Sequence, residues 1–214
     1  GAAVDWEDRQ AELIACLDKL RTDGIKVTPL NDKDKDGAKF LIKEIDPFTF
    51  LGSFNRQTRP KERLAILTEV KKLLGASKPL PEDFNGIPTV NNMQSWFIAY
   101  QAKRGRGDVE TLWNVFRLAL CDNPLDNPEF AQAFDSALNV WGVSTNLTMG
   151  LFWIRPDSFL NLDNVNRTYL DIKLPPQGLS AEFYIKTVKS VAAKGKPLPD
   201  VSYDAWQSTI TDDG

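Results

Sequence analysis

The stretch NLTMGLFWIRPDSFLNLDNVNRTYL, residues 146–170, decides the fold predicted for this chain. Its uncharged run MGLFWI (149–154) is rich in bulky and aromatic residues and predicts a strand buried on both faces. Pro156 ends that strand, because proline has no backbone donor for a sheet and favours an extended predecessor. Trp153 and Arg155 then stand at the strand's end, where they could build either a recognition surface or part of the core.

Helical periodicity and end signals predict about five helices around this stretch. They cover residues 5–21, 60–74, 108–120, 128–141 and 181–193. Residues 38–45 predict a strand, residues 46–54 a short apolar helical turn, and residues 93–100 either a strand or a helix. We therefore expect the α+β class: a helix-dominant single domain with a few short buried strands. It is expected to span residues 1–199, followed by a flexible acidic tail at 200–214.

The composition is that of a globular protein with one sizeable core. Of its 214 residues, 42% are hydrophobic and 26% are charged. No apolar run approaches the roughly 20 residues that span a bilayer, and no secretory signal is visible, so we expect a cytoplasmic protein without a membrane partner. Cys16 and Cys121 lie in apolar helical patterns and are expected to be buried free thiols.

Several kinds of catalytic chemistry are excluded by residues that the chain lacks. It contains no histidine, which removes Ser-His-Asp and Cys-His arrangements and, with two cysteines, the usual zinc sites. A Walker A loop for nucleotide binding is also missing, since Gly195-Lys196 is followed by proline. We expect no catalytic residue, no metal and no cofactor.

Two carboxylate patterns are incomplete. Asp32, Asp34 and Asp36 match the front half of a calcium loop, but Lys43 stands where a bidentate glutamate is needed, so a solvated turn is favoured. Asp157 and the later Asp171-x-Lys173 match a short nuclease pattern, yet the second acid falls in a segment that looks helical.

The charge is unevenly distributed along the chain. The net charge is −3, but residues 1–12 and 200–214 each hold four acids, which leaves 25 basic and 21 acidic residues over 13–199. Two basic clusters stand out, at residues 56–63 and in the glycine-containing loop 101–107. Guanidinium groups in such places suit phosphate oxygens, although a solvated surface is the simpler interpretation.

Four stretches together resemble a known family. They are GLFWIRPDSFLNLD with NVNRTYL in the central region, IDPFTFLGSFNR (45–56), LPEDFNGIPTVNNMQSWFIAY (80–100) and DVETLWNVFRLAL (108–120). Their order and spacing resemble the amino-terminal region of McrB-like AAA+ ATPases, the motor subunits of modification-dependent restriction systems. In that family the motor lies carboxy-terminal to this region, a separate subunit cleaves DNA, and the amino-terminal domain can recognise a modified base.

The resemblance implies a DNA-binding specificity domain of a restriction or phage-defence ATPase. Its partners would be duplex DNA, the motor domain and the nuclease subunit. The candidate DNA-binding residues are Arg104, Arg106, Lys103, Arg56 and Arg59 for phosphates, and Asn91, Asn92, Trp96, Trp153 and Arg155 for bases. The alternative is a protein-interaction or regulatory module that docks a partner subunit or a phage-encoded trigger.

Overall fold

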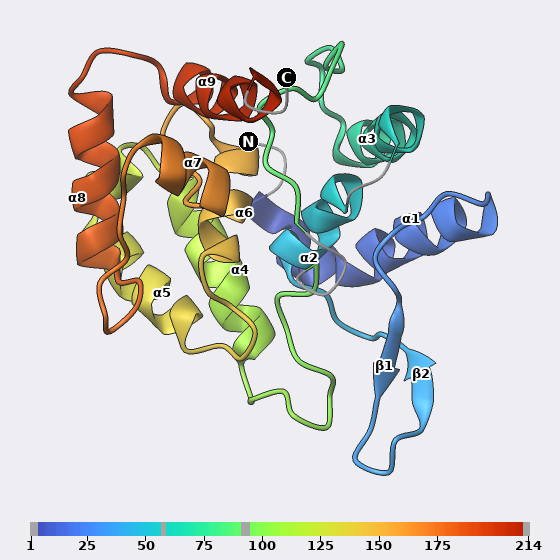
Figure 1. Ribbon diagram of the computed structural model, residues 1–214. Helices are drawn as coiled ribbons and strands as arrows, with labels where there is room; N and C mark the ends of the chain where they lie inside the picture. The colour runs from blue at the N-terminus through green and yellow to red at the C-terminus, as the bar shows by residue number, and fades with distance from the viewer. Residues whose placement is uncertain (1–3, 57–58, 91–94, 212–214) are drawn as a thin grey trace. The chain divides into compact units, whose positions relative to one another are not determined.

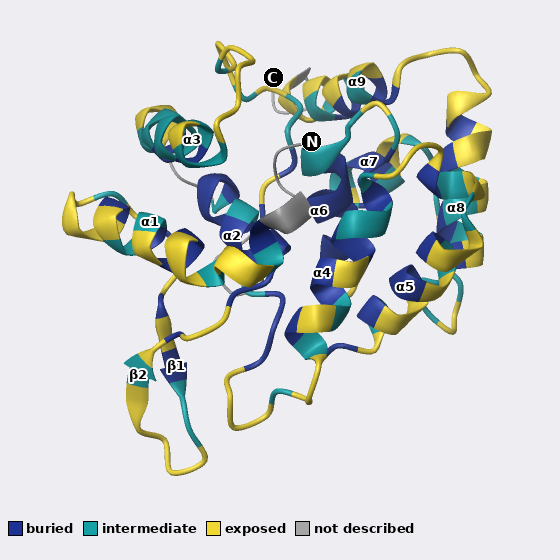
Figure 2. Cartoon of the chain, turned by 180° about the vertical axis from the view of Figure 1, so that it is seen from behind, coloured by how far each residue is buried: buried dark blue, intermediate teal, exposed yellow. Residues whose placement is uncertain are grey.

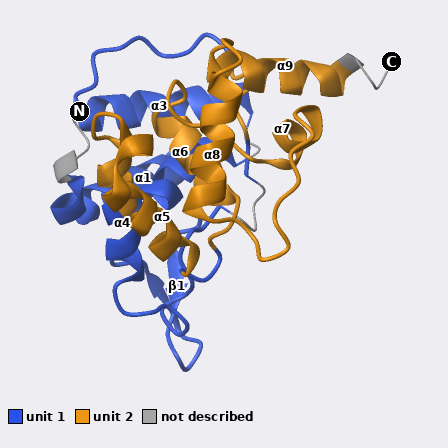
Figure 3. Cartoon of the chain, turned by 90° about the vertical axis from the view of Figure 1, so that its left-hand side faces the viewer, with its two compact units in different colours: residues 1–83, 89–114, 140–142 blue, residues 84–88, 115–139, 143–214 orange. Residues whose placement is uncertain are grey.

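The computed structural model describes residues 4–56, 59–90 and 95–211 of the chain (Figure 1). It is 54% helical with a small two-stranded antiparallel sheet, which confirms the α+β class with helices dominant. The chain divides into two compact units, shown in different colours in Figure 3. Unit 1 holds residues 1–83, 89–114 and 140–142, and unit 2 holds residues 84–88, 115–139 and 143–214.

The two-stranded sheet found in the described part of the chain lies in unit 1. Its elements are η1 (Val4–Arg9), α1 (Gln10–Thr22), β1 (Asn31–Lys33), β2 (Lys39–Leu41), α2 (Pro47–Gly52), η2 (Ser53–Asn55), α3 (Pro60–Leu74) and the start of α4 (Asp108–Ala119). The strands pair with Asp32 opposite Phe40. Asp34 closes the turn between them, because its carboxylate accepts from the backbone N–H of Ala38 at 2.8 Å. The calcium-like pattern therefore forms a hairpin turn.

The core of unit 1 forms where the sequence predicts it. α1 buries Leu13, Ile14, Leu17 and Leu20 at helical spacing. α2 begins at the N-cap Asp46, whose carboxylate accepts from the N–H groups of Phe48 and Thr49, each at 2.9 Å. The phenylalanines of this short helix are buried, and the predicted apolar helical turn at residues 46–54 is confirmed.

α3 begins at Pro60 and ends before Gly75, as the sequence predicts. The buried residues of the helix are Arg63, Ile66 and Val70, whereas Leu64 and Leu67 are only half-buried. Arg63 turns inward because its guanidinium donates to the Phe54 carbonyl at 3.1 Å and to the Asn55 side chain. Hydrophobic periodicity could not show this, because it counts arginine as a solvent-facing residue.

Unit 2 is helical throughout its described residues. Its elements are the end of α4, η3 (Pro124–Asp126), α5 (Pro128–Leu138), α6 (Asn146–Ile154), α7 (Asn164–Tyr169), α8 (Ala181–Ala192) and α9 (Leu198–Thr211). Side-chain oxygens of Asn127, Asp163 and Ser180 cap α5, α7 and α8 by accepting from N–H groups of the first turn. The helix starts predicted at residues 128 and 181 are thereby confirmed.

The predicted strand at residues 149–154 is wrong, because these residues belong to α6. Asn146 to Phe152 are all buried, and Figure 2 shows α6 dark blue along nearly its whole length. A helix buried on all sides has no polar face, so its sequence shows no helical period. A short uncharged run then fits a strand and a helix equally well.

The prediction of a flexible tail beyond residue 199 is also not what the structure has. Residues up to 211 form α9, in which Val201, Ser202 and Ala205 are buried. Ser202 lies in a buried polar cluster, since its hydroxyl donates to the Gly86 carbonyl at 2.8 Å and the Asn161 amide contacts it at 2.9 Å. The prediction rested on the acidic composition of residues 200–214, which does not indicate these buried apolar residues and hydrogen bonds.

Both cysteines are free; Cys16 is half-buried, but Cys121 is exposed, contrary to the prediction of two buried thiols. Among the helices of the described residues, none combines the length and the apolar character needed to cross a membrane. Asp157 and Asp171 are both exposed and follow helices, so the strand pair that a nuclease core requires is not formed at these positions.

Candidate nucleic-acid interface

The basic loop 101–107 lies against β1 in unit 1. It begins with a turn in which the N–H groups of Lys103 and Arg104 both donate to the Tyr100 carbonyl, at 2.8 and 2.9 Å. The N–H of Ala102 donates to the Lys33 carbonyl of β1 at 3.1 Å. These backbone bonds tie the start of the loop to the hairpin, so the hairpin sets where the loop backbone lies.

The buried side chain of Arg104 holds this loop against the rest of unit 1. Its side chain is 6% exposed, and its guanidinium pairs with Asp32, 2.6 Å away and 1% exposed, and with the partly exposed Glu44. Asp32 also accepts from the N–H of Gln101 at 2.7 Å. The prediction of Arg104 as an exposed phosphate contact is corrected, because both terminal nitrogens of its guanidinium are already paired with the carboxylates of Asp32 and Glu44.

Exposed aromatic rings and lysines surround the anchored loop. The Tyr100 ring is 46% exposed with the Lys33 ammonium 4.9 Å from its centre, and Trp141 is 67% exposed with the Lys103 ammonium at 6.0 Å. Arg106, three residues beyond Lys103, is exposed as well. We call Lys33, Tyr100, Lys103, Arg106 and Trp141 the aromatic–basic surface. Exposed rings interleaved with cations are typical of nucleic-acid contacts.

Sequence reasoning found Lys103 and Arg106 but missed the two rings. Trp141 continues the helical spacing of Phe130, Phe134 and Leu138, which predicts a core position, but α5 ends at Leu138 and leaves Trp141 beyond it. The Asn139 and Gly142 that flank it, with Gly142 at φ 91°, are the signal that could have indicated the break.

Trp96 lies beside this surface. Its ring is half-buried and tilted against the Tyr100 ring, with 5.5 Å between the centres. Its indole nitrogen is buried and has no hydrogen-bond partner among the residues that the structure describes. The predicted base-reading residues Asn91 and Asn92 lie outside the described residues.

The second predicted basic cluster does not form one surface. Arg56 is half-buried, donates to the Val27 carbonyl at 2.5 Å, and has its pKa lowered by burial. Burial likewise lowers the pKa of Arg63 to about 10. Arg59, in contrast, is exposed at the N-cap position of α3. Of this cluster, Arg59 is a candidate for phosphate contact, while Arg56 and Arg63 stabilise the fold.

Trp153 and Arg155 belong to unit 2 and have structural partners. The Trp153 indole donates to the Pro88 carbonyl at 3.0 Å. The Arg155 guanidinium donates to the Cys121 carbonyl at 2.6 Å and to the Ala119 carbonyl at 3.2 Å. These bonds tie the end of α6 to Pro88 and to the end of α4, so the predicted role of both residues in DNA binding is corrected to a structural one.

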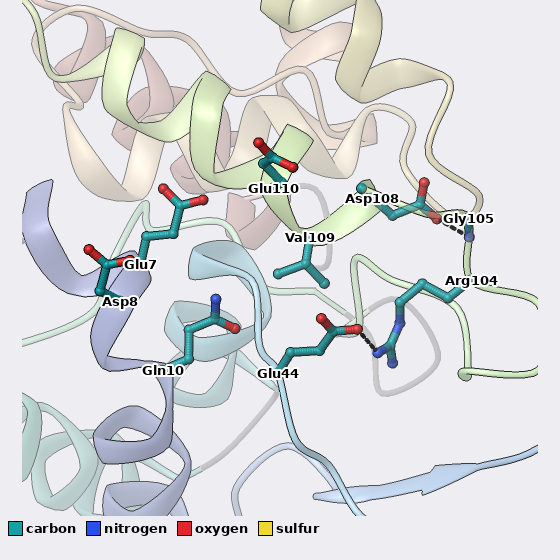
Figure 4. Close-up of a pocket in the computed structure, with 10 residues that line it drawn as sticks. Glu7, Asp8, Gln10, Glu44, Arg104, Gly105, Asp108, Val109 and Glu110 are labelled. Atoms are coloured by element: carbon teal, nitrogen blue, oxygen red, sulfur yellow. Dashed lines mark hydrogen bonds and ion pairs between the residues drawn. The ribbon is translucent and has the colours of Figure 1, made fainter.

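A cavity of about 380 Å³ in unit 1 has the opposite character to the aromatic–basic surface. Figure 4 shows the carboxylates of Glu7, Asp8 and Glu110 around it, with Glu44 facing Arg104. Its one cation is already paired, so a phosphate would meet uncompensated negative charge there. No group of acidic, cysteine or histidine side chains among the described residues is arranged to hold a metal ion. The cavity is therefore excluded as a site for nucleic acid.

Comparison with known proteins gives one match. A family model with the description "Domain of unknown function (DUF8425)" matches residues 2–208. No curated protein and no solved structure matches the chain.

Proposed function

Since the chain belongs to the DUF8425 family, we propose its function from the geometry of unit 1: it is a DNA-binding specificity domain. The observation that carries this proposal is the pairing of exposed rings with cations, Tyr100 with Lys33 and Trp141 with Lys103. Rings stack on bases and ammonium groups contact phosphates, so the combination suits a nucleic acid. The resemblance to McrB-like ATPases supports a place in a restriction or phage-defence system, with the motor domain and the nuclease subunit as partners.

The charge distribution supports placing the contact in unit 1. Unit 1 holds 18 basic and 17 acidic residues, a net charge of +1, whereas unit 2 holds 8 and 12, a net charge of −4. Within unit 1, Lys103, Arg106 and Arg59 are exposed and can contact phosphates. Arg104 acts indirectly, because its ion pairs hold the loop in place.

Recognition of a modified base requires contact with the base itself, since phosphate contacts carry no sequence information. We assign that contact to the exposed Tyr100 ring, against which the Trp96 ring packs with 5.5 Å between the ring centres.

The test is a charge reversal of the loop, Lys103→Glu with Arg106→Glu, in the whole chain. Binding to a duplex is measured by fluorescence anisotropy over a range of salt concentrations. Two lost phosphate contacts should reduce the slope of log affinity against log salt by about two. The matched control is Lys78→Glu with Lys194→Glu, which changes the net charge equally at exposed positions outside the surface. An equal loss of duplex affinity in both variants would show a nonspecific effect of net charge, and the loop would then not be part of the interface.

A protein-interaction module that docks a partner subunit or a phage-encoded trigger is the second candidate. It is favoured by an apolar stripe on α9, where Tyr203 is 39% exposed, Ile210 is 56% exposed and Trp206 lies between them. An uncovered apolar stripe at helical spacing is typical of a helix that packs against a partner. Partner docking through this stripe would depend little on salt, whereas DNA binding depends on it steeply.

A further inference from the structure

Trp141 is the most exposed large hydrophobic side chain in the described part of the protein, at 67%. Its neighbours Val140 and Val143 are buried, at 4% and 8% exposed. The two valines therefore hold this turn in place, and the indole between them is not needed for packing. Trp6 and Trp113, by comparison, are 4% and 2% exposed. Tryptophan is enriched among the residues that carry most of the binding energy of interfaces, so an exposed one that the fold does not use is a candidate binding residue.

The lysine beside Trp141 leaves most of the ring accessible. The Lys103 ammonium lies 6.0 Å from the ring centre, at the outer limit of a cation–π contact. The same arrangement occurs at Tyr100, where Lys33 lies 4.9 Å from the ring. The surface therefore contains two pairs, each made of one aromatic ring and one cation. A nucleic-acid strand offers matching partners, since each of its nucleotides has one base and one phosphate.

Paired bases cannot use such rings, because both of their faces are stacked inside the duplex. Unpaired bases expose their faces, and each gains by stacking on an aromatic side chain. Trp141 also lies on an exposed turn, which suits a strand passing across the surface. From these observations we infer that the aromatic–basic surface binds single-stranded DNA, with one unpaired base stacked on Trp141 and the adjacent phosphate on Lys103. This inference rests on the proposed DNA-binding function and names the form of DNA that the site takes.

The anchored loop explains how the site is ready before DNA arrives. Arg104 is fixed by Asp32 and Glu44, and the Tyr100 carbonyl closes the turn that carries Lys103. A loop backbone that is already ordered loses little conformational entropy on binding. The exposed side chains of the surface then lose most of the conformational freedom that binding costs.

The experiment compares a labelled single strand of about 15 nucleotides with a duplex of the same length, a range that covers the usual site sizes. We expect the whole chain to bind the single strand about tenfold more tightly. Trp141→Ala should lower single-strand affinity by about tenfold or more, the usual effect of losing one stacked base. It should leave the salt slope of single-strand binding unchanged, because no phosphate contact is lost. Trp141→Phe should retain part of the affinity, because a smaller ring still stacks.

Trp206→Ala is the matched control, since it removes a partly exposed tryptophan outside the surface and should leave single-strand affinity unchanged. Stacking should also quench tryptophan fluorescence in the wild type but not in Trp141→Phe. Thermal unfolding checks that each variant is folded. Duplex binding as tight as single-strand binding, tighter binding of the same sequence as RNA, or wild-type single-strand affinity in Trp141→Ala overturns this inference alone. Absence of binding to either form of DNA overturns the proposed function as well.

Discussion

At the scale of single residues, Asp46 shows how a buried cap couples folding to pH. Its side chain is fully buried; one carboxylate oxygen accepts from two backbone N–H groups of α2, and the other has no partner among the described residues. Burial raises the pKa of Asp46 from 3.8 to about 6, because desolvation of the charged form outweighs its hydrogen bonds. The folded protein therefore holds this proton at a pH where the unfolded chain has lost it.

The sign of the effect follows from that difference. The contribution of Asp46 to stability is fully present below pH 3.8 and is lost as the pH rises through about 6. Asp46→Asn keeps an oxygen that can cap α2 but carries no charge. We expect this variant to gain roughly 2 to 3 kcal/mol over the wild type at pH 7.5 and little at pH 4. Urea unfolding at both pH values measures the free energy of unfolding of the variant and the wild type. If the variant differed from the wild type by the same amount at pH 7.5 and pH 4, Asp46 would not titrate between them.

At the scale of elements, capped helix starts could be predicted, whereas buried faces could be predicted only where they follow a clear helical period, as in α1. Caps such as Asp46 and Asn127 act on N–H groups within three residues, so the sequence near them contains all that is needed. α6 could not be predicted, because burial on every side removes its helical period. The role of Arg104 was equally hidden, since its partner Asp32 lies 72 positions away in the sequence. The exposed Lys103 and Arg106 were predicted, as local composition alone indicates a solvated loop.

Gly86 gives a test of how α9 is held. It has φ +69°, and a Cβ built there would lie 2.8 Å from the backbone Cα of Tyr203. Gly86→Ala should therefore lower the free energy of unfolding by roughly 2 to 4 kcal/mol, from strain and from the forced movement of α9. Gly178→Ala is the matched control, because its φ is +96° but nothing lies within 4 Å. It should cost only about 1 kcal/mol. Denaturant unfolding of both variants measures the difference, and equal losses would mean that α9 does not press on Gly86.

At the scale of the whole molecule, each compact unit is assembled from segments that are separate in the sequence. α4 contributes residues to both units, and unit 2 takes residues 84–88 from a part of the chain that otherwise belongs to unit 1. That short segment supplies the carbonyl groups of Gly86 and Pro88, which accept from Ser202 and Trp153. Neither unit is therefore a continuous piece of chain.

This organisation predicts that a fragment of residues 115–214 will not fold as unit 2 does. The fragment lacks residues 84–88, so the Ser202 hydroxyl, which is 2% exposed, loses the Gly86 carbonyl, and the half-buried Trp153 indole loses the Pro88 carbonyl. Leaving a buried donor such as the Ser202 hydroxyl without its acceptor costs about 1 to 3 kcal/mol, which is a large part of the stability of a domain this small. We expect the whole chain to unfold in a cooperative thermal transition and the fragment to show a broad one, with weak near-ultraviolet circular dichroism. A second fragment, 84–214, restores the missing carbonyls and should regain part of the cooperativity. Cooperative unfolding of 115–214 at the temperature of the whole chain would show that unit 2 does not depend on this segment.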